Sequence, residues 1–198
     1  MILAVECSVA VGSVAIFCGG ECRHYREFPA RMAGGTDAGA VIAAMLAEHG
    51  GEGITHCAVG IGPGSFSGIR SALGFLQGFC APKGLPIIGI PSAAACARNL
   101  AKDGVPDAYR IVGDARRDRY WVADYRWDGE RLHETASIRL VPYGERGTEA
   151  RVYSPEPERI RAATASPVPP TARDIGLLAL ASPELHRPPL PLYLHPAV

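Results

Sequence analysis

The 198-residue chain lacks an excess of charge of either sign, because 20 Lys and Arg residues balance 20 Asp and Glu residues. A domain that binds nucleic acid by itself usually carries a basic surplus, so the composition argues against autonomous binding of that kind. The chain also lacks an apolar run of about 18 residues, and we expect no membrane association. It opens with MILAVE, which has an early acid and no basic leader, so we expect no signal peptide and a cytoplasmic protein.

The sequence has no recognisable metal or catalytic motif. Its six cysteines include no C-x-x-C pair, and no second Cys or His pair stands at zinc spacing. No Ser-His-Asp set has a defensible spacing. We therefore predict no catalytic residue and no metal site. Four cysteines lie in apolar stretches and are expected to be buried thiols: Cys7, Cys57, Cys80 and Cys96.

The most informative stretch is residues 61–77, IGPGSFSGIRSALGFLQ. An apolar run at residues 56–61 predicts a buried strand, and the glycines and proline at 62–64 predict a turn. A periodic pattern then predicts a helix over residues 67–80, capped by Ser65 or Ser67. We expect Gly64 to need a positive φ in this turn.

Such a turn directs backbone N–H groups and a helix N-terminus at one point, which suits an anion. Gly62, Gly64 and Gly68 are spaced one residue too far for G-x-G-x-x-G, and no Lys-Ser or Lys-Thr follows as in a P-loop. Two interpretations remain open: an anion-facing loop, or a close-packed turn between a strand and a helix.

The order of predicted elements indicates an α/β protein. Three antiparallel strands are followed by βαβ units, which gives a mixed five-stranded sheet flanked by helices. Its strands are expected at residues 2–6, 12–18, 22–28, 56–61 and 85–90. The other helices of this part are expected at 36–49, capped by Thr36 or Asp37, and at 93–100, capped by Ser92.

A segment rich in Gly and Pro at residues 102–107 indicates a lobe boundary, so we predict lobes at 1–103 and 104–198. The second lobe is predicted to contain strands at 109–114, 119–126 and 131–140, a short strand at 151–153 and a helix at 171–181.

Three segments of the chain resemble the TsaB (YeaZ) family. GPGSFSGIRSALGFLQGF at residues 62–79 is similar to the family's GPGSFTGVRIG signature. DARRDRYWVADY at 114–125 resembles its D-A-R-x-x-x-V-Y-x-A-x-Y hairpin, and LPLYL at 190–194 matches its terminal P-x-Y-L. The resemblance implies the ribonuclease-H-like fold of the actin-like ATPase (ASKHA) superfamily, with a reduced second domain.

The resemblance also implies a role in tRNA modification. Family members are partners in making threonylcarbamoyladenosine next to the anticodon, together with the transferase TsaD and the ATPase TsaE. It implies a non-catalytic scaffold subunit that meets tRNA indirectly and binds no cofactor tightly, with ATP or ADP only at an interface with partners. The alternatives are a stand-alone kinase or ATPase of the same fold, and a homodimeric scaffold for an unrelated partner.

Active members of this fold carry an aspartate in the first loop that organises metal and phosphate. The TsaB opening usually reads LAIDTS, and here Glu6 takes the place of the acid with one more methylene. Glu6 is then either the remnant of a nucleotide site or a polar residue that closes a strand. The resemblance indicates these nucleotide- or anion-facing residues: Glu6, Ser8, Gly62, Gly64 and Ser65.

Two helices, at residues 36–49 and 67–80, carry more small and apolar positions than one buried face needs. The family pairs through a helical bundle in its first domain, so we expect a homodimer alone and a heterodimer with a TsaD homologue. The predicted interface residues are Val41, Met45, Gly68, Ile69, Ala72, Leu73 and Leu76. On this interpretation Ala72→Arg, or Leu76→Glu, blocks pairing without unfolding the chain.

Overall fold

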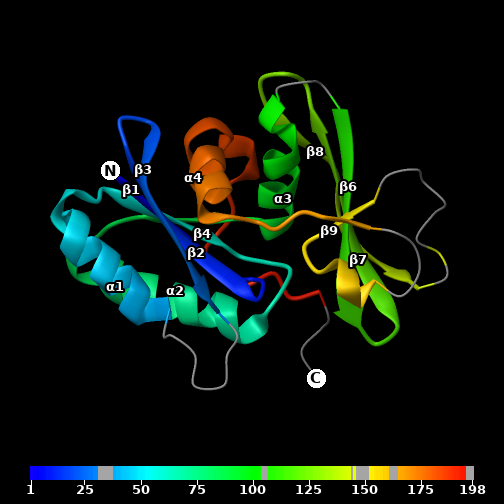
Figure 1. Cartoon of the computed structure of the whole chain (residues 1–198), viewed down its shortest axis with the longest axis horizontal. Coiled ribbons are helices and arrows are strands. Elements are labelled where there is room, and N and C mark those ends of the chain that lie inside the picture. The colour runs from blue at the N-terminus through cyan, green and yellow to red at the C-terminus, as the bar shows by residue number, and fades with distance from the viewer. Residues whose placement is uncertain (31–37, 104–106, 144, 146–151, 161–164, 195–198) are drawn as a thin grey trace.

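Two five-stranded sheets stand side by side in the computed structural model, with two helices between them and two outside (Figure 1). The structure describes residues 1–30, 38–103, 107–143, 145, 152–160 and 165–194. The helix caps predicted at Thr36 and Asp37 lie outside this part of the chain. The α/β class and the mixed sheet flanked by helices are as predicted from the sequence.

The first sheet has the strand order β3-β2-β1-β4-β5. β1, β2 and β3 pair antiparallel, whereas β4 and β5 run parallel to β1. Helices cover both faces, so its central strands are buried along almost their whole length rather than on alternate residues. The strand bounds are β1 Ile2–Glu6, β2 Val11–Cys18, β3 Glu21–Pro29, β4 His56–Gly60 and β5 Ile87–Ile90.

The second sheet has the order β10-β9-β6-β7-β8. Its three long strands form antiparallel hairpins, as the alternating pattern of the second half predicts. In the turn between β6 and β7, Arg116, Arg117 and Asp118 all have positive φ, at 64°, 52° and 57°. The strand bounds are β6 Asp107–Arg116, β7 Arg119–Trp127, β8 Leu132–Pro142, β9 Tyr153–Ser154 and β10 Ser166–Pro167.

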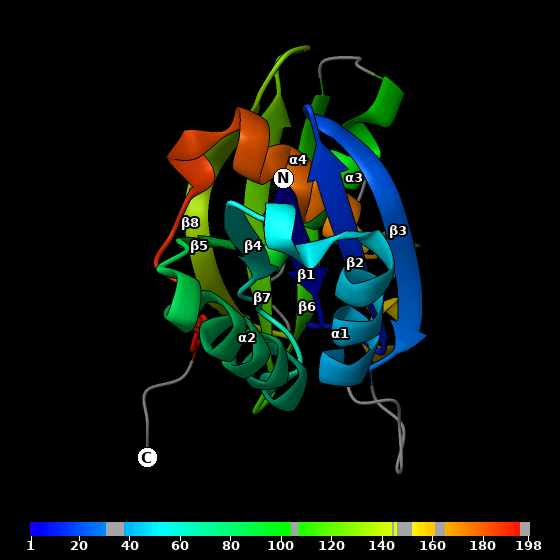
Figure 2. The ribbon, with the colours of Figure 1, turned by 90° about the vertical axis from the view of Figure 1, so that its left-hand side faces the viewer.

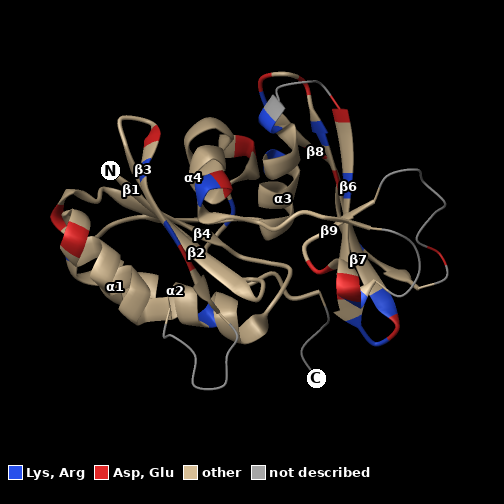
Figure 3. Ribbon diagram, in the orientation of Figure 1, with Lys and Arg blue, Asp and Glu red and all other residues tan. Residues whose placement is uncertain are grey.

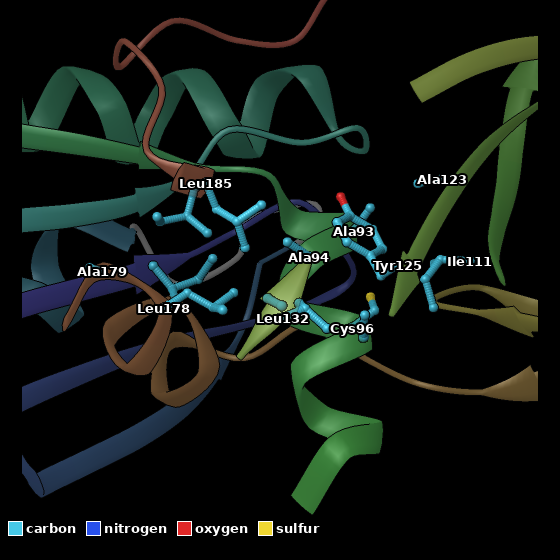
Figure 4. Close-up of a cluster of buried hydrophobic side chains, with 14 of the residues drawn as sticks. Ala93, Ala94, Cys96, Ile111, Ala123, Tyr125, Leu132, Leu178, Ala179 and Leu185 are labelled. Atoms are coloured by element: carbon cyan, nitrogen blue, oxygen red, sulfur yellow. The ribbon is translucent and has the colours of Figure 1, made fainter. Parts of the chain in front are cut away.

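Helices α1 (Ala38–His49) and α2 (Phe66–Cys80) lie side by side on one face of the first sheet (Figure 2). Helices α3 (Ser92–Leu100) and α4 (Ala172–Ala181) lie on the other face, toward the second sheet. The core between the sheets joins all of these elements: Ala93, Ala94 and Cys96 of α3 meet Ile111 and Tyr125 of the second sheet (Figure 4).

The C-terminal part of the chain returns to the first sheet. Helix α4 packs across β1, β2 and β4. Arg187 and Gly89 of β5 then exchange two backbone hydrogen bonds of 2.9 Å, and the Leu192 N–H donates to the Ile61 carbonyl over 2.9 Å. We call residues 187–194 the C-terminal strap. The part of the chain after β5 therefore supplies the second sheet and also, through α4 and the strap, contacts to the first sheet.

All six cysteines are free thiols, and Cys7, Cys57, Cys80 and Cys96 are buried as predicted. Within the described residues, no helix has both the length and the apolar character needed to cross a bilayer.

Candidate functional site

The turn between β4 and α2 has a glycine in the left-handed region, but it is Gly62, with φ 97°, and not Gly64. Gly64 is required for another reason, because the backbone of Ser8 passes directly beside it. A Cβ on Gly64 would lie 2.7 Å from the Cβ of Ser8 and 2.9 Å from its carbonyl carbon. The Ser65 N–H also donates to the Ser8 carbonyl over 2.7 Å, which ties the two loops together.

Ser65 is the N-cap of α2, one of the two caps predicted. Its Oγ accepts from the Gly68 N–H at 3.3 Å, and its carbonyl accepts from the Ile69 N–H at 3.0 Å. The N–H groups of Gly62 and Ser65 bond inside the protein, to Ser92 Oγ at 3.0 Å and to the Ser8 carbonyl. Two backbone N–H donors that would have to face an anion are thus already bonded inside the protein. This favours the interpretation as a close-packed turn between a strand and a helix over that of an anion-facing loop.

Glu6 is completely buried and does not face a cleft. Its Oε1 accepts from the Ser8 N–H at 2.5 Å, and its Oε2 accepts from Ser92 Oγ at 2.8 Å. Burial raises the pKa of the Glu6 carboxyl, although these hydrogen bonds oppose the shift. The side chain occupies the space where residue 60 would carry a Cβ, so glycine is needed there.

Ser92 was predicted to cap a helix, but the N-cap of α3 is Pro91. The Ser92 hydroxyl instead donates to Glu6 and accepts from Gly62. The extra methylene of Glu6 lets its carboxyl reach this hydroxyl across the end of β4. Ser92 therefore joins the first loop, the glycine turn and the start of α3.

A cleft of about 630 Å³ is lined by residues from both halves of the chain. Gly64 and Ser65 line it, whereas the predicted anion-facing residues Glu6, Ser8 and Gly62 do not. Its other walls come from the β6–β7 hairpin, the segment at 155–159 and the strap. The lining includes Phe66, Ser67, Asp114, Arg116, Trp121, Glu156, Arg159, Leu192 and Tyr193.

The charges of the cleft are unequally exposed. The Arg116 side chain is 72% exposed, whereas that of Asp114, 3.8 Å away, is 12% exposed. Asp114 Oδ1 accepts from the Tyr143 hydroxyl at 3.0 Å and from the Arg116 N–H at 2.8 Å. Arg159 likewise is more exposed than Glu156, at 33% against 19%. In each of these pairs the arginine is therefore the more exposed of the two charges.

Two exposed aromatic rings stand at the mouth of the cleft, and the sequence analysis missed both. Phe66 is 53% exposed and Tyr193 is 61% exposed, with ring centroids 5.7 Å apart. The Arg70 guanidinium lies 5.0 Å from the centroid of the Phe66 ring. The sequence feature that could have identified these rings is their position in the family motifs, GPGSF for Phe66 and P-x-Y-L for Tyr193.

The structure corrects the predicted interface, because six of its seven residues are buried in the protein's own core. Their apolar stripe faces the first sheet, as the stripe of a helix on a sheet does. A charge at Ala72 or Leu76, both 0% exposed, would unfold the chain rather than only block pairing. The buried residues are Met45, Gly68, Ile69, Ala72, Leu73 and Leu76, and Val41 is half-buried.

The outer face of α1 and α2 carries mostly small residues. Glu48 of α1 and Arg70 of α2 are the only Asp, Glu, Lys or Arg residues in these two helices. Figure 3 accordingly shows both helices almost entirely tan. We call this surface the small-residue face. It comprises Ala40, Ala43, Ala44, Ala47, Ser67, Ser71, Gly74, Gln77 and Gly78, all exposed.

Among the residues that the structure describes, no three His, Cys, Asp or Glu side chains lie close enough to hold a metal ion. His49, in the last turn of α1, is stacked on His24 with ring centroids 3.6 Å apart.

The two mixed sheets and the helices that flank them define an α/β protein. Two solved Pseudomonas aeruginosa structures share the fold over 98% of this chain and 99% of their own. One, named YeaZ, has a TM-score of 0.71 and 26% identity. The other, described as similar to the peptidase YeaZ, has a TM-score of 0.76 and 24% identity.

Sequence comparisons assign the family. Residues 37–147 match the family model described as TsaD, tRNA N6-adenosine threonylcarbamoyltransferase. The Escherichia coli (strain K12) tRNA threonylcarbamoyladenosine biosynthesis protein TsaB is 30% identical over 95 residues, which cover 44% of this chain and 41% of that protein. The chain belongs to the family of this model.

Proposed function

We propose that this protein is a non-catalytic partner subunit for the synthesis of N6-threonylcarbamoyladenosine in tRNA, acting with homologues of TsaD and TsaE. Its likeness to TsaB and YeaZ supports the pathway. The burial of Glu6 carries the inference that the subunit is not catalytic. The one acid at the place of the metal-organising aspartate is bonded to Ser8 and Ser92 inside the protein and does not line the cleft.

The same burial argues against a stand-alone kinase or ATPase. Such an enzyme needs an accessible acid near the phosphates to hold Mg²⁺. On this proposal the protein is cytoplasmic and binds no cofactor tightly, and ATP or ADP takes part only where the chain meets its partners. Sustained ATP hydrolysis by the purified chain would favour the enzyme instead.

We further propose that the small-residue face is the pairing surface, toward a second copy in the free protein and toward the TsaD homologue in the complex. Small side chains allow two helices to approach closely, and an uncharged face can be buried without leaving charges unpaired. The surface lies on the same two helices as the interface predicted from the sequence, but on their opposite side.

We expect Gly74→Arg and Gly78→Glu to weaken pairing by roughly tenfold or more while the chain stays folded, because each buries an unpaired charge in the interface. A Cβ at either glycine meets no atom within 4 Å, so the isolated fold tolerates a side chain there. Light scattering measures self-association, and a pull-down measures binding to the TsaD homologue. Leu180→Arg, at a position on α4 that is 43% exposed, is the matched control. Normal pairing by both glycine variants would place the interface elsewhere.

The role is tested by reconstitution. Purified TsaD and TsaE homologues, with the remaining substrates and unmodified tRNA, are incubated with and without this protein. Modified adenosine is expected only in the complete mixture, and none from this chain alone. Equal modification after omission of the chain would contradict the proposed function.

A further inference from the structure

The row of flat groups at the mouth of the cleft has an unusual exposure. Arg70, Phe66 and Tyr193 lie next to one another, with 5.0 Å from the guanidinium to the Phe66 centroid and 5.7 Å between the two ring centroids, whose planes are tilted by 43°. Both rings are more than half exposed, and a third large apolar side chain, Leu190 of the strap, is 64% exposed nearby in sequence. Rings that served only to pack the core would be buried, and these two are not.

The opposite wall supplies positive charge. The β6–β7 hairpin presents Arg116, Arg117 and Arg119 together with Asp118, all exposed, so its tip has a surplus of positive charge, and Arg116 lines the same cleft as Phe66 and Tyr193. The acid closest to it, Asp114, is largely covered and bonded to Tyr143. Figure 3 shows the charged tip of this hairpin beside β7, facing away from α1.

We propose that this surface, made by Arg70, Phe66, Tyr193, Arg116 and Arg117, binds unpaired nucleotides of an RNA strand directly. Nucleobases stack on aromatic rings and on guanidinium planes, so a base extends the existing row. Guanidinium groups across the cleft bind the phosphates between such bases. The choice of RNA rests on the proposed function, in which tRNA is the substrate of the complex.

The neutral composition fits a contact of this limited size. With no basic surplus over the whole chain, affinity comes from one patch, and the isolated protein binds weakly and with strong dependence on salt. An acidic peptide would use the same arginines but would gain little from a row of flat groups. RNA loops therefore suit the surface better than a peptide does.

The experiment measures fluorescence anisotropy of a labelled anticodon stem-loop RNA with the full-length protein at low salt. A fully paired hairpin of equal length and a labelled poly-glutamate peptide are the competing probes. We expect the wild-type protein to bind the stem-loop more tightly than either. Phe66→Ala combined with Tyr193→Ala is expected to weaken stem-loop binding about tenfold and to remove the preference over paired RNA. Arg116→Ala combined with Arg117→Ala is expected to weaken both RNAs and reduce the salt slope by about 1–2.

Two sets of variants check that the effects are local. Leu180→Ala and Arg23→Ala change an exposed apolar residue and an exposed arginine outside the surface, and both should bind as the wild type does. Phe66→Tyr combined with Tyr193→Phe keeps both rings and should retain binding, which separates stacking from misfolding. Unchanged binding by the alanine variants, or tighter binding of the peptide than of the stem-loop, overturns the proposal. Reconstituted tRNA modification is measured separately. If the chain binds RNA but is not required for modification, the proposed function is contradicted and the RNA-binding proposal is kept.

Discussion

Gly60→Ala is expected to destabilise the protein by about 3 kcal/mol or more, at or above the upper end of what overpacking a core usually costs. The new methyl group would occupy the space of the Glu6 carboxyl and would lie 2.9 Å from Ser92 Oγ. Neither neighbour can move away easily. Glu6 is held by the Ser8 N–H and by Ser92, and Ser92 is held in turn by the Gly62 N–H. Urea unfolding of the purified variant measures the loss.

A second substitution tests the cause. Glu6→Asp withdraws the carboxyl by one methylene, so alanine at position 60 should cost roughly 1–2 kcal/mol less in that background than in the wild type. Gly74→Ala is the control, because its Cβ meets nothing and alanine favours a helix by about 1 kcal/mol over glycine. A Gly60→Ala penalty that is the same in the Glu6→Asp background as in the wild type would show that the clash is not with this carboxyl.

Local signals were sufficient to predict most of the first sheet and the helices around it. The strand ending in a glycine turn and the helix after it depend on residues adjacent in the chain, and both appear where expected. The cap of α4 at Thr171 also follows from a local pattern, since its side chain accepts from the Asp174 N–H at 3.2 Å. The hairpin around residues 116–119 was likewise readable from its turn.

Contacts between distant residues could not be predicted in this way. Glu6 and Ser92 are 86 positions apart, and no pattern near either shows that they share a hydrogen bond. The return of α4 to the first sheet is of the same kind: the Ala172 N–H donates to Ser13 Oγ over 2.8 Å. The cleft could not be predicted locally either, because its walls come from five separate parts of the chain.

The helical surface illustrates a different limit. The sequence shows that α2 has an apolar stripe and several small residues, but not which of the two faces the sheet. Burial of an apolar stripe stabilises the fold more than burial of glycines does, so the stripe turns inward. Ile69 and Leu73 accordingly pack in the core, and Gly74 and Gly78 remain outside.

Glu6→Gln is expected to stabilise the protein at neutral pH by roughly 1–3 kcal/mol, the scale of a buried group's unmet desolvation cost. Glutamine keeps the shape of the side chain and removes the charge. Burial is the largest influence on the Glu6 pKa and raises it above the ordinary value of 4.5. The folded state therefore favours the protonated acid, and the neutral amide resembles that form.

The pH dependence follows from this direction. A carboxyl whose pKa is raised on folding contributes stability that is fully present below its unfolded pKa and is lost as the pH rises through its folded pKa. The advantage of the Glu6→Gln variant over the wild type should consequently be small near pH 5 and should grow as the pH rises from there to neutral and above. Urea unfolding of both proteins across this range measures the difference in their free energies of unfolding. Groups that both proteins share, such as Asp174, contribute equally to each and cancel in this difference. Glu21→Gln, at an acid with a side chain 69% exposed, is the control and should show little effect at any pH. Two results would contradict this prediction: a Glu6→Gln variant less stable than the wild type near pH 8, or an advantage that does not change with pH. Either would mean that Glu6 is ionised in the folded protein and that its hydrogen bonds to Ser8 and Ser92 outweigh the cost of its burial.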